Sequence, residues 1–376
     1  MHSVEGKSNA SGIRWRDGKV VWMGLELEAV IDERDPVLLH GLKSRIKFAR
    51  LVRRKLNGHN RFYVQLVCEG RPYQKYELGE GVVGMDLGPS TIAVAGERDV
   101  FLAQFCVELE DNRAEIRRLQ RKLDRQRRAN NPDNYLPDGQ VRPGPKVWRK
   151  SKRQMATETK LSEMQRKQAA YRKSLHGQML NRILQMGDTF KLEQISYRAF
   201  QRRFGRSVGM RAPGMFVERL CRKAESAGGT TLVFSTHATR LSQVCHGCGT
   251  VHKKPLSQRW HRCECGVEAQ RDLYSAFLAT CVEEGDDGIP SLNAGRAKEA
   301  WPGADSLLQA ALGDIEPARG GLSNLPSSFG LSDQRRSRSP VQPEGKTSEA
   351  QDAVGGWSTV VRESGRACSI SGTPRL

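Results

Sequence analysis

The sequence predicts an α/β fold built on one mixed sheet, preceded by a small β-rich domain and interrupted by a helical insert and a cysteine-rich insert. Three observations predict this fold. Short apolar strand patterns lie on both sides of a long helical region, as in mixed sheets with helices packed against them. Three regular elements each contain an acidic residue that is out of place there. Two cysteine pairs precede the last of these elements.

The composition favours a polyanionic partner. The chain has 376 residues, with 61 Lys and Arg against 42 Asp and Glu, a formal net charge of +19. Such a charge favours nucleic acid or an anionic membrane surface. No run approaches the roughly 18 apolar residues of a membrane-spanning helix, and the first residues lack the pattern of a signal peptide. We therefore expect a cytoplasmic protein, nucleoid-associated in a prokaryotic host, with no membrane partner.

Residues 1–80 are expected to form a β-rich domain that binds nucleic acid. Val20–Ile31 reads as a strand, and RFYVQLVCEG after NGHN reads as the return strand of a hairpin. The stretch that leads into this hairpin is strongly basic and contains no acid. An uncompensated basic face favours a phosphate backbone, with a charge-protected edge strand as the alternative. The basic residues are Lys43, Arg45, Lys47, Arg50, Arg53, Arg54, Lys55 and Arg61.

Residues 81–284 are expected to form the main domain, which begins with an apolar strand that contains a carboxylate. GVVGMDLG, Gly81–Gly88, places Asp86 inside this strand. Two more short strands, Thr91–Gly96 and Val100–Val107, complete an antiparallel meander. An unpaired buried carboxylate is costly, so Asp86 either binds a ligand at the mouth of the strand or caps a turn.

Residues 108–188 are expected to form a basic helical insert. Apolar residues keep helical spacing in two segments, from Ile116 to Leu123 and from Leu175 to Ile183, on either side of a Pro/Gly-rich break. From Asp111 to Met186, 20 Lys and Arg face 7 Asp and Glu, an excess of +13. This imbalance favours nucleic-acid contact over a merely solvated helix pair. The candidate contacts are Arg117, Arg118, Arg121, Lys150, Lys152, Arg172 and Lys173.

The rest of the main domain alternates strands and helices, and two of these elements contain an acid. Glu193 lies inside a strand. Asp272 lies at a helix N-terminus, where the dipole favours an anion and a helix cap is the alternative role. The expected elements are a strand at Thr189–Ile195, a loop at Gly205–Gly214, a helix at Met215–Ala227, a buried strand at Thr231–Thr236 and a helix from Arg271 to about Glu283. Residues 285–376 are expected to be a low-complexity, mostly disordered tail, with at most a short helix around Leu307–Leu312.

Two cysteine pairs within residues 243–267 predict a zinc ribbon. CHGC and, fourteen residues later, CEC are each followed directly by glycine. Four thiolates around one ion make a closed tetrahedral Zn²⁺ site, which is structural rather than catalytic. In a reducing compartment such a cluster indicates metal before disulfide. The predicted ligands are Cys245, Cys248, Cys263 and Cys265, with His246, His252 or His261 as alternatives for one of them.

The order of the elements is typical of an RNase H-like core of the RuvC type. It runs from a strand with Asp86 through two strands, a helical insert, a strand with Glu193, a helix and a strand to a helix with Asp272. Three carboxylates that converge at one sheet edge repel unless cations neutralise them. Two Mg²⁺ ions about 3.5–4 Å apart do so, and they clamp the attacking and leaving oxygens in phosphodiester hydrolysis.

Several motifs resemble those of the transposon-encoded TnpB proteins, relatives of the type V CRISPR effector nucleases. They are GMDLG around Asp86, KLEQIS around Glu193, CHGCG and RCECG in the cysteine pairs, and QRDLYSAFLA around Asp272. FARLVRRKLNGHNRFYVQLVCEG is similar to the strand pair that precedes this family's nuclease core. The resemblance extends from about Val20 to Cys281.

The resemblance implies an RNA-guided, Mg²⁺-dependent DNA endonuclease. By motif match, Asp86, Glu193 and Asp272 would be the catalytic acids that hold two Mg²⁺ ions. The implied partners are a guide RNA and double- and single-stranded DNA. The chain departs from the family in having only 85 residues before Asp86, which leaves little room for a helical recognition lobe. The alternative is a catalytically inactive RNA-guided DNA-binding protein or a transposition accessory factor.

Overall fold

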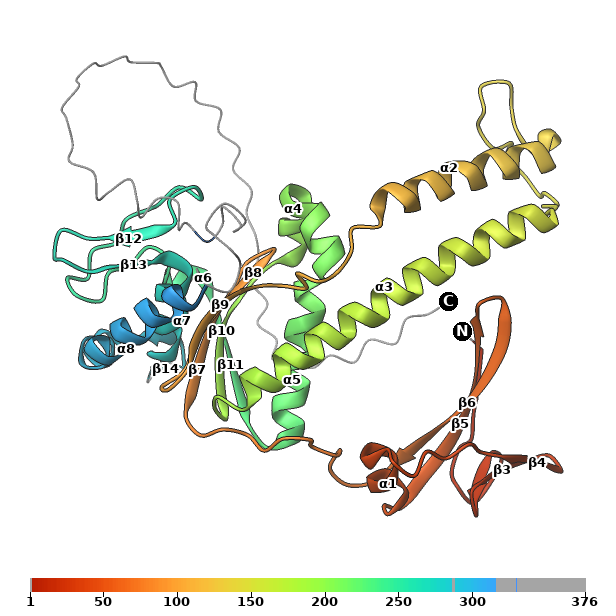
Figure 1. Cartoon of the computed structure of the whole chain (residues 1–376), viewed down its shortest axis with the longest axis horizontal. Coiled ribbons are helices and arrows are strands. Elements are labelled where there is room, and N and C mark those ends of the chain that lie inside the picture. The colour runs from red at the N-terminus through yellow and green to blue at the C-terminus, as the bar shows by residue number, and fades with distance from the viewer. Residues whose placement is uncertain (1, 286–287, 316–328, 330–376) are drawn as a thin grey trace. The chain divides into compact units, whose positions relative to one another are not determined.

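The computed structural model describes residues 2–285, 288–315 and 329 (Figure 1). The chain divides into two units, Met1–Gln334 and Arg335–Leu376, and the second lies entirely outside the described residues. None of the described helices is long and apolar enough to cross a lipid bilayer.

Two three-stranded antiparallel sheets and one short helix form the N-terminal part of the chain. One sheet has the order β1-β5-β6, and its long β5–β6 pair confirms the predicted hairpin. Ile13, Val20 and Ala49 form a small core. Val20–Ile31 is not one strand, because Met23 and Gly24 have φ angles of 48° and 81° and so turn the chain into a second hairpin. The elements are β1 (His2–Glu5), β2 (Arg14–Arg16), β3 (Lys19–Trp22), β4 (Leu25–Glu28), α1 (Pro36–Leu42), β5 (Ile46–Leu56) and β6 (His59–Cys68).

A five-stranded mixed sheet forms the centre of the main domain, as the sequence predicted. Its order is β11-β10-β7-β8-β9; β7, β8 and β9 are antiparallel neighbours, whereas β10 and β11 run parallel to β7. β11 lies at the edge of the sheet and is only partly covered, so the expectation of a buried strand there is wrong. The strands are β7 (Val82–Leu87), β8 (Thr91–Ala95), β9 (Val100–Gln104), β10 (Thr189–Gln194) and β11 (Thr230–Ser235).

Helices cover both faces of this sheet (Figure 1). One face packs against the end of α3 (Lys152–Leu184) and against α5 (Pro213–Ala227). The other face packs against α7 (Arg271–Thr280), which is buried along most of its length, and α8 (Ala294–Ile315). Side chains alternate across a strand, so the two faces of β7 have different chemistry. Its buried Val83, Met85 and Leu87 belong to the α3–α5 side, which leaves Gly84 and Asp86 to the α7 side.

Gly84 lets α7 lie directly on the backbone of β7. A Cβ at Gly84 would lie 2.1 Å from the carbonyl oxygen of Ala276 and 2.7 Å from the amide nitrogen of Thr280. We expect Gly84→Ala to lower the free energy of unfolding by about 3 kcal/mol, since neither backbone can yield without moving α7. Denaturant unfolding measures this loss. The control is Gly303→Ala on α8, where a Cβ meets nothing within 4 Å; equal stability of both variants would contradict the prediction.

The helical insert is present as predicted, and a helix replaces the loop expected at Gly205–Gly214. α2 (Arg113–Asn130) and α3 lie side by side, joined by a loop over residues 131–151 that starts with a short 3₁₀ turn at Pro132–Asn134 (Figure 1). α4 (Tyr197–Arg211) is kinked at Phe204, whose φ and ψ of −119° and 27° are not helical, and it ends at Ala212, which has a φ of 50°. Tertiary hydrogen bonds hold its C-terminal half and override the weak helix preference of glycine.

The prediction of a disordered tail from residue 285 is wrong for residues 288–315. β14 (Val282–Glu284) pairs with β15 (Pro290–Leu292), and α8 follows, with Leu308 and Leu312 buried in the core beside α7. α7 ends at Thr280, and β14 occupies the positions up to Glu283 that were assigned to its helix. Apart from residue 329, the tail beyond 315 lies outside the described residues.

Candidate functional site

The ends of two parallel strands bring Asp86 and Glu193 together. β10 pairs with β7 in a register that aligns Leu192 with Met85, so the next residue on each strand, Glu193 and Asp86, are neighbours. Leu192 and Met85 belong to the α3–α5 side, and the acids therefore face α7. Asp272, the second residue of α7, approaches the same place because α7 packs across β7.

The three carboxylates lie within range of one another's charge. Burial is the main cause that raises the pKa of Asp86 well above its usual range, followed by the negative charges of Asp272 and Glu193. Burial also raises the pKa of Glu193, and the hydroxyl of Thr239, 3.5 Å from Glu193 Oε1, partly offsets this effect. Thr239 belongs to α6 (Thr236–Thr239), directly after β11. The three acids singled out in the sequence thus meet at one end of the sheet, where the charges of Asp272 and Glu193 both disfavour an ionised Asp86.

The three acids are spread more widely than the ligands of one tightly held ion. In the part of the chain that the structure describes, only a cysteine group brings three or more His, Cys, Asp or Glu ligand atoms within 4.8 Å of one another. A pair of metal ions can be held by carboxylates that are more widely spaced than the ligands of one ion. Mutually repelling carboxylates also suit hard cations, which relieve the repulsion. The carboxylates are the hard-oxygen donors that Mg²⁺ prefers, and their role as ligands stays a prediction.

Two arginines that sequence reasoning missed border the acids. Arg259 Nη1 lies 3.8 Å from Asp272 Oδ2, and Arg271 Nε lies 3.4 Å from Asp272 Oδ1. Both positive charges act to lower the pKa of Asp86 and so offset part of the repulsion. Arg271 also donates from Nη1 to the carbonyl oxygens of Pro255 and Gln258. The one sequence signal for Arg271 was its place next to Asp272 in QRDLYSAFLA; nothing local marked Arg259.

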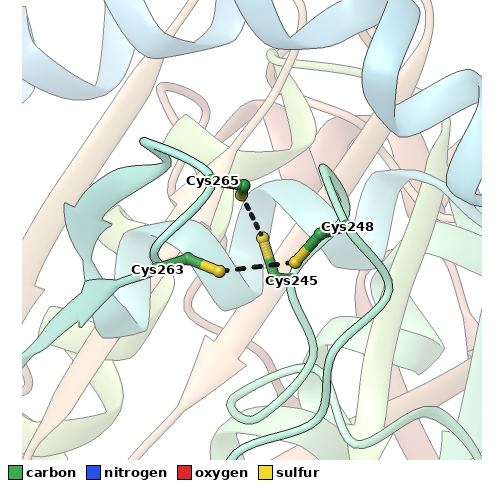
Figure 2. A group of neighbouring side chains, drawn as sticks. All are labelled: Cys245, Cys248, Cys263 and Cys265. Atoms are coloured by element: carbon green, nitrogen blue, oxygen red, sulfur yellow. Dashed lines mark hydrogen bonds between the residues drawn. The ribbon is translucent and has the colours of Figure 1, made fainter.

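Four cysteines meet in one cluster between β11 and α7 (Figure 2). Their Sγ atoms all lie within 4.8 Å of one another; the Cys245–Cys265 distance is 3.5 Å and the Cys248–Cys263 distance is 3.4 Å. All four are free thiols rather than disulfides. A tetrahedral site with Zn–S bonds of about 2.3 Å places sulfurs about 3.8 Å apart, so the cluster fits one Zn²⁺ ion.

Turns and hydrogen bonds shape this cluster. Gly249 and Gly266, which follow the two cysteine pairs, have φ angles of 75° and 92°, which favour glycine. The backbone amide of Cys265 is the main cause that lowers the pKa of Cys263 to about 6, and a thiol of low pKa is a ready metal ligand. Burial raises the pKa of Cys245 to about 12, so binding of a cation there must displace a proton.

The histidines considered as alternative ligands are not part of the cluster. His246 Nδ1 lies 2.8 Å from the hydroxyl of Tyr274, and His261 Nδ1 lies 2.8 Å from Lys254 Nζ. No histidine belongs to the four-cysteine group among the described residues, and His252 is exposed. The ligand set that the structure brings together is therefore four cysteines.

The cysteine cluster is tied directly to α7. A small ribbon of β12 (Trp260–Arg262) and β13 (Glu268–Gln270) leads into this helix. The hydroxyl of Tyr274 lies 3.0 Å from the backbone nitrogen of His246, between the first two cysteines. Arg271 N donates to the carbonyl oxygen of Arg259 at 2.8 Å. Movement of the cysteine loops would therefore also displace Asp272 at the start of α7.

The basic residues of the hairpin are exposed at its tip. Acidic residues neutralise more of their charge than the sequence suggested. Arg50 pairs with Glu5, and Arg45 lies 3.7 Å from Glu69, because the fold brings in acids from other strands. Arg54 stacks over Tyr63 at 5.3 Å. The expectation of one basic face is wrong near the tip, where three consecutive exposed residues place charge on both faces. These residues are Arg53, Arg54 and Lys55; Lys43 and Lys47 are also exposed.

The helical insert presents some of its predicted contacts and uses others internally. Arg118 pairs with Glu115, and Lys150 pairs with Glu158. Arg172 is half-buried and donates to the carbonyl oxygens of Gly209 and Met210, so it anchors α4. The remaining candidates are exposed and form no ion pair within the described ranges. They are Arg117, Arg121, Lys152 and Lys173.

The segment from α5 to α7 is similar to a known domain. Residues 214–278 match the family model described as "Cas12f1-like, TNB domain". This segment holds all four cysteines of the cluster and Asp272. The match extends over less than half of the chain, so it characterises the cysteine ribbon and its flanking helices.

Two solved structures show a lower similarity over a longer stretch. One is described as the "Cas12f1-sgRNA-target DNA complex", with 14% identity, 62% of this chain and 45% of that chain covered, and a TM-score of 0.38. The other, a "CRISPR-Cas12f Ternary Complex", has 14% identity, 65% and 46% coverage, and a TM-score of 0.30. The chain thus spans less than half of either protein, and TM-scores below 0.5 do not establish a shared fold. No curated protein matches the chain.

Proposed function

We propose that the chain is an RNA-guided, Mg²⁺-dependent DNA endonuclease of the TnpB and Cas12f kind, with an RNase H-like core. The observation that carries this proposal is the meeting of Asp86, Glu193 and Asp272 at the end of a sheet ordered β9-β8-β7-β10-β11. These acids come from three distant parts of the chain, and no structural need explains their mutual repulsion. The similarity of residues 214–278 to a Cas12f1-like domain supports the same class.

In this proposal Asp86, Glu193 and Asp272 hold two Mg²⁺ ions, which when bound supply charge stabilisation and an activated water for phosphodiester hydrolysis. The chain's own residues position the reaction. β7 and β10 set the spacing of two acids, and Thr239 orients the carboxylate of Glu193. Arg259 offsets negative charge at Asp272.

In this proposal the exposed basic residues of the hairpin and of α2–α3 bind the nucleic acid. The two elements touch at the hairpin tip, where Asn57 N donates to Glu163 Oε1 on α3 at 2.7 Å. Exposed basic residues on both elements suit a long polyanion, because each neutralised phosphate adds affinity that salt weakens. The cysteine ribbon holds one Zn²⁺ ion as a structural support for α7.

Sequencing the RNA that purifies with the protein, followed by a cleavage assay, tests the proposal. We expect a defined co-purifying RNA and Mg²⁺-dependent cleavage only of DNA that is complementary to it. Unguided DNA cleavage by RNA-free protein would contradict the proposed role of a guide RNA, but it would still support nuclease activity. Mg²⁺-independent binding without any cleavage would instead identify an RNA-guided binding protein or a transposition accessory factor.

A further inference from the structure

The first half of α4 carries aromatic and basic side chains that no role described above uses. Tyr197, Phe200 and Phe204 lie three and four residues apart, the last of them at the kink of α4, with ring centroids 6.2 Å and 6.0 Å apart in edge-to-face contacts. Phe204 is 36% exposed, and neither phenylalanine belongs to a core cluster in the described part of the chain. Tyr197 lies against Gly214 of α5 and forms the covered end of this row, whereas Phe200 and Phe204 are left for a ligand.

The arginines of this half-helix are not used by the protein itself. α4 contains five arginines and no acid. Arg206 pairs with Asp111, and Arg211 donates to the carbonyl oxygen of Phe105. The other three are exposed and form no ion pair or hydrogen bond with a described residue; they are Arg198, Arg202 and Arg203.

α4 starts close to the carboxylates, and its second half is held at the end of β7. It begins four residues after Glu193, and the charge of Asp86 contributes to the raised pKa of Tyr197, after burial. Near its other end, Ser207 Oγ donates at 2.7 Å to the carbonyl oxygen of Pro89, just beyond the end of β7. Figure 1 shows α4 near the ends of the strands. The C-terminal half is thus anchored, while the N-terminal half begins close to Asp86 and carries the rings and the unpaired arginines.

We propose that residues 197–204 form a stacking platform for single-stranded DNA that leads the strand to the carboxylates. Successive aromatic rings accept unpaired bases regardless of sequence, and nearby arginines bind the phosphates between them. A duplex is excluded as the occupant because its bases have no free faces. The role of the platform in DNA cleavage rests on the proposed function. DNA binding by α4 does not, because it can be measured without cleavage.

Two measurements on the full chain test this platform. Mg²⁺-free binding of a fluorescent oligothymidine should weaken about tenfold in Phe204→Ala with an unchanged salt dependence, whereas Arg203→Ala should reduce the salt slope by about 0.7. Phe204→Tyr should restore binding, because it keeps the ring. The matched control is Tyr76→Ala, which removes a ring of similar exposure outside α4. Photocrosslinking with 5-iododeoxyuridine DNA, mapped by mass spectrometry, should identify Phe200 or Phe204.

The outcomes separate this inference from the proposed function. Unchanged binding in Phe204→Ala, or cross-links only outside residues 197–204, overturns the platform even if the wild type cleaves DNA. Loss of binding in Phe204→Ala with rescue by Phe204→Tyr supports it even if no cleavage occurs. In a cleaving wild type, Phe204→Ala should raise KM about tenfold with little change in kcat. Cross-links to the co-purifying RNA instead of DNA would overturn the assignment to the DNA strand.

Discussion

Asp86→Asn should abolish Mg²⁺-dependent DNA cleavage while making the metal-free protein more stable. The activity should fall at least about 1,000-fold, because one of the three acids that hold the ions loses its charge. The free energy of unfolding without Mg²⁺ should rise by about 1 kcal/mol, since the substitution removes a carboxylate that burial and the charges of Asp272 and Glu193 disfavour. For a domain of this size the thermal midpoint should rise by about 2–4 °C.

The pH dependence follows from the direction of the pKa shift. A carboxyl whose pKa is raised on folding stabilises the protein below its unfolded pKa, and this contribution is lost as the pH rises through the folded pKa. The pKa of Asp86 is raised on folding, so the metal-free wild type should lose stability as the pH rises from the ordinary carboxyl range towards neutrality. Mg²⁺ should restore that stability at neutral pH. Asp86→Asn should show a weaker pH dependence and little response to Mg²⁺.

Thermal melts over a pH series, with and without Mg²⁺, measure these effects beside a cleavage assay. The buffers should contain no chelator, which would also remove zinc. Asp133→Asn is the matched control, because Asp133 is exposed and far from the acids in the sequence; it should change neither activity nor stability. An Asp86→Asn variant that cleaves normally, or that is less stable than wild type without metal, would contradict the metal centre.

Loss of zinc should disable the protein by a different route. Cys245→Ser should reduce bound zinc from about one ion per chain to nearly none and lower the thermal midpoint, because structural zinc contributes on the order of 10 kcal/mol to small domains that depend on it. Cleavage should disappear as well. The ribbon contacts α7 through Tyr274, and the loop before β12 holds Arg271 next to Asp272.

Metal analysis, thermal melts and cleavage assays with saturating Mg²⁺ distinguish this route from direct damage to the acids. Excess Mg²⁺ should not rescue the zinc-free protein, whereas added Zn²⁺ should rescue wild type that a strong chelator has stripped. Cys68→Ser is the control, since Cys68 is a half-buried free thiol on β6 outside the cluster; it should keep one zinc and full activity. A Cys245→Ser protein that retains zinc would mean that the ligand set is not four cysteines.

Sequence-based prediction failed where a local signal competed with a tertiary one. Gly205 and Gly209 favoured a loop, yet Arg172 and Ser207 hold this stretch as a helix by hydrogen bonds to distant backbone. In α8, Pro302 interrupts the local helix pattern, but the helix is stabilised by burial of its apolar residues against α7. The positive charge of the hairpin was overestimated for the same reason. The fold brings Glu5 and Glu69 next to its arginines from other parts of the chain.

Patterns within short stretches were sufficient to predict the mixed sheet, the helical insert, the cysteine pairs and three acids as candidate site residues. Apolar periodicity and ligand spacing are local properties of the sequence. The relations between those stretches came from packing alone. The β7–β10 register that makes Asp86 and Glu193 neighbours, the close approach of α7 at Gly84, and the position of Arg259 beside Asp272 all depend on residues far apart along the chain. Long-range contacts of this kind leave no periodic trace in the sequence, since each is decided by which surfaces bury most when the whole chain has folded.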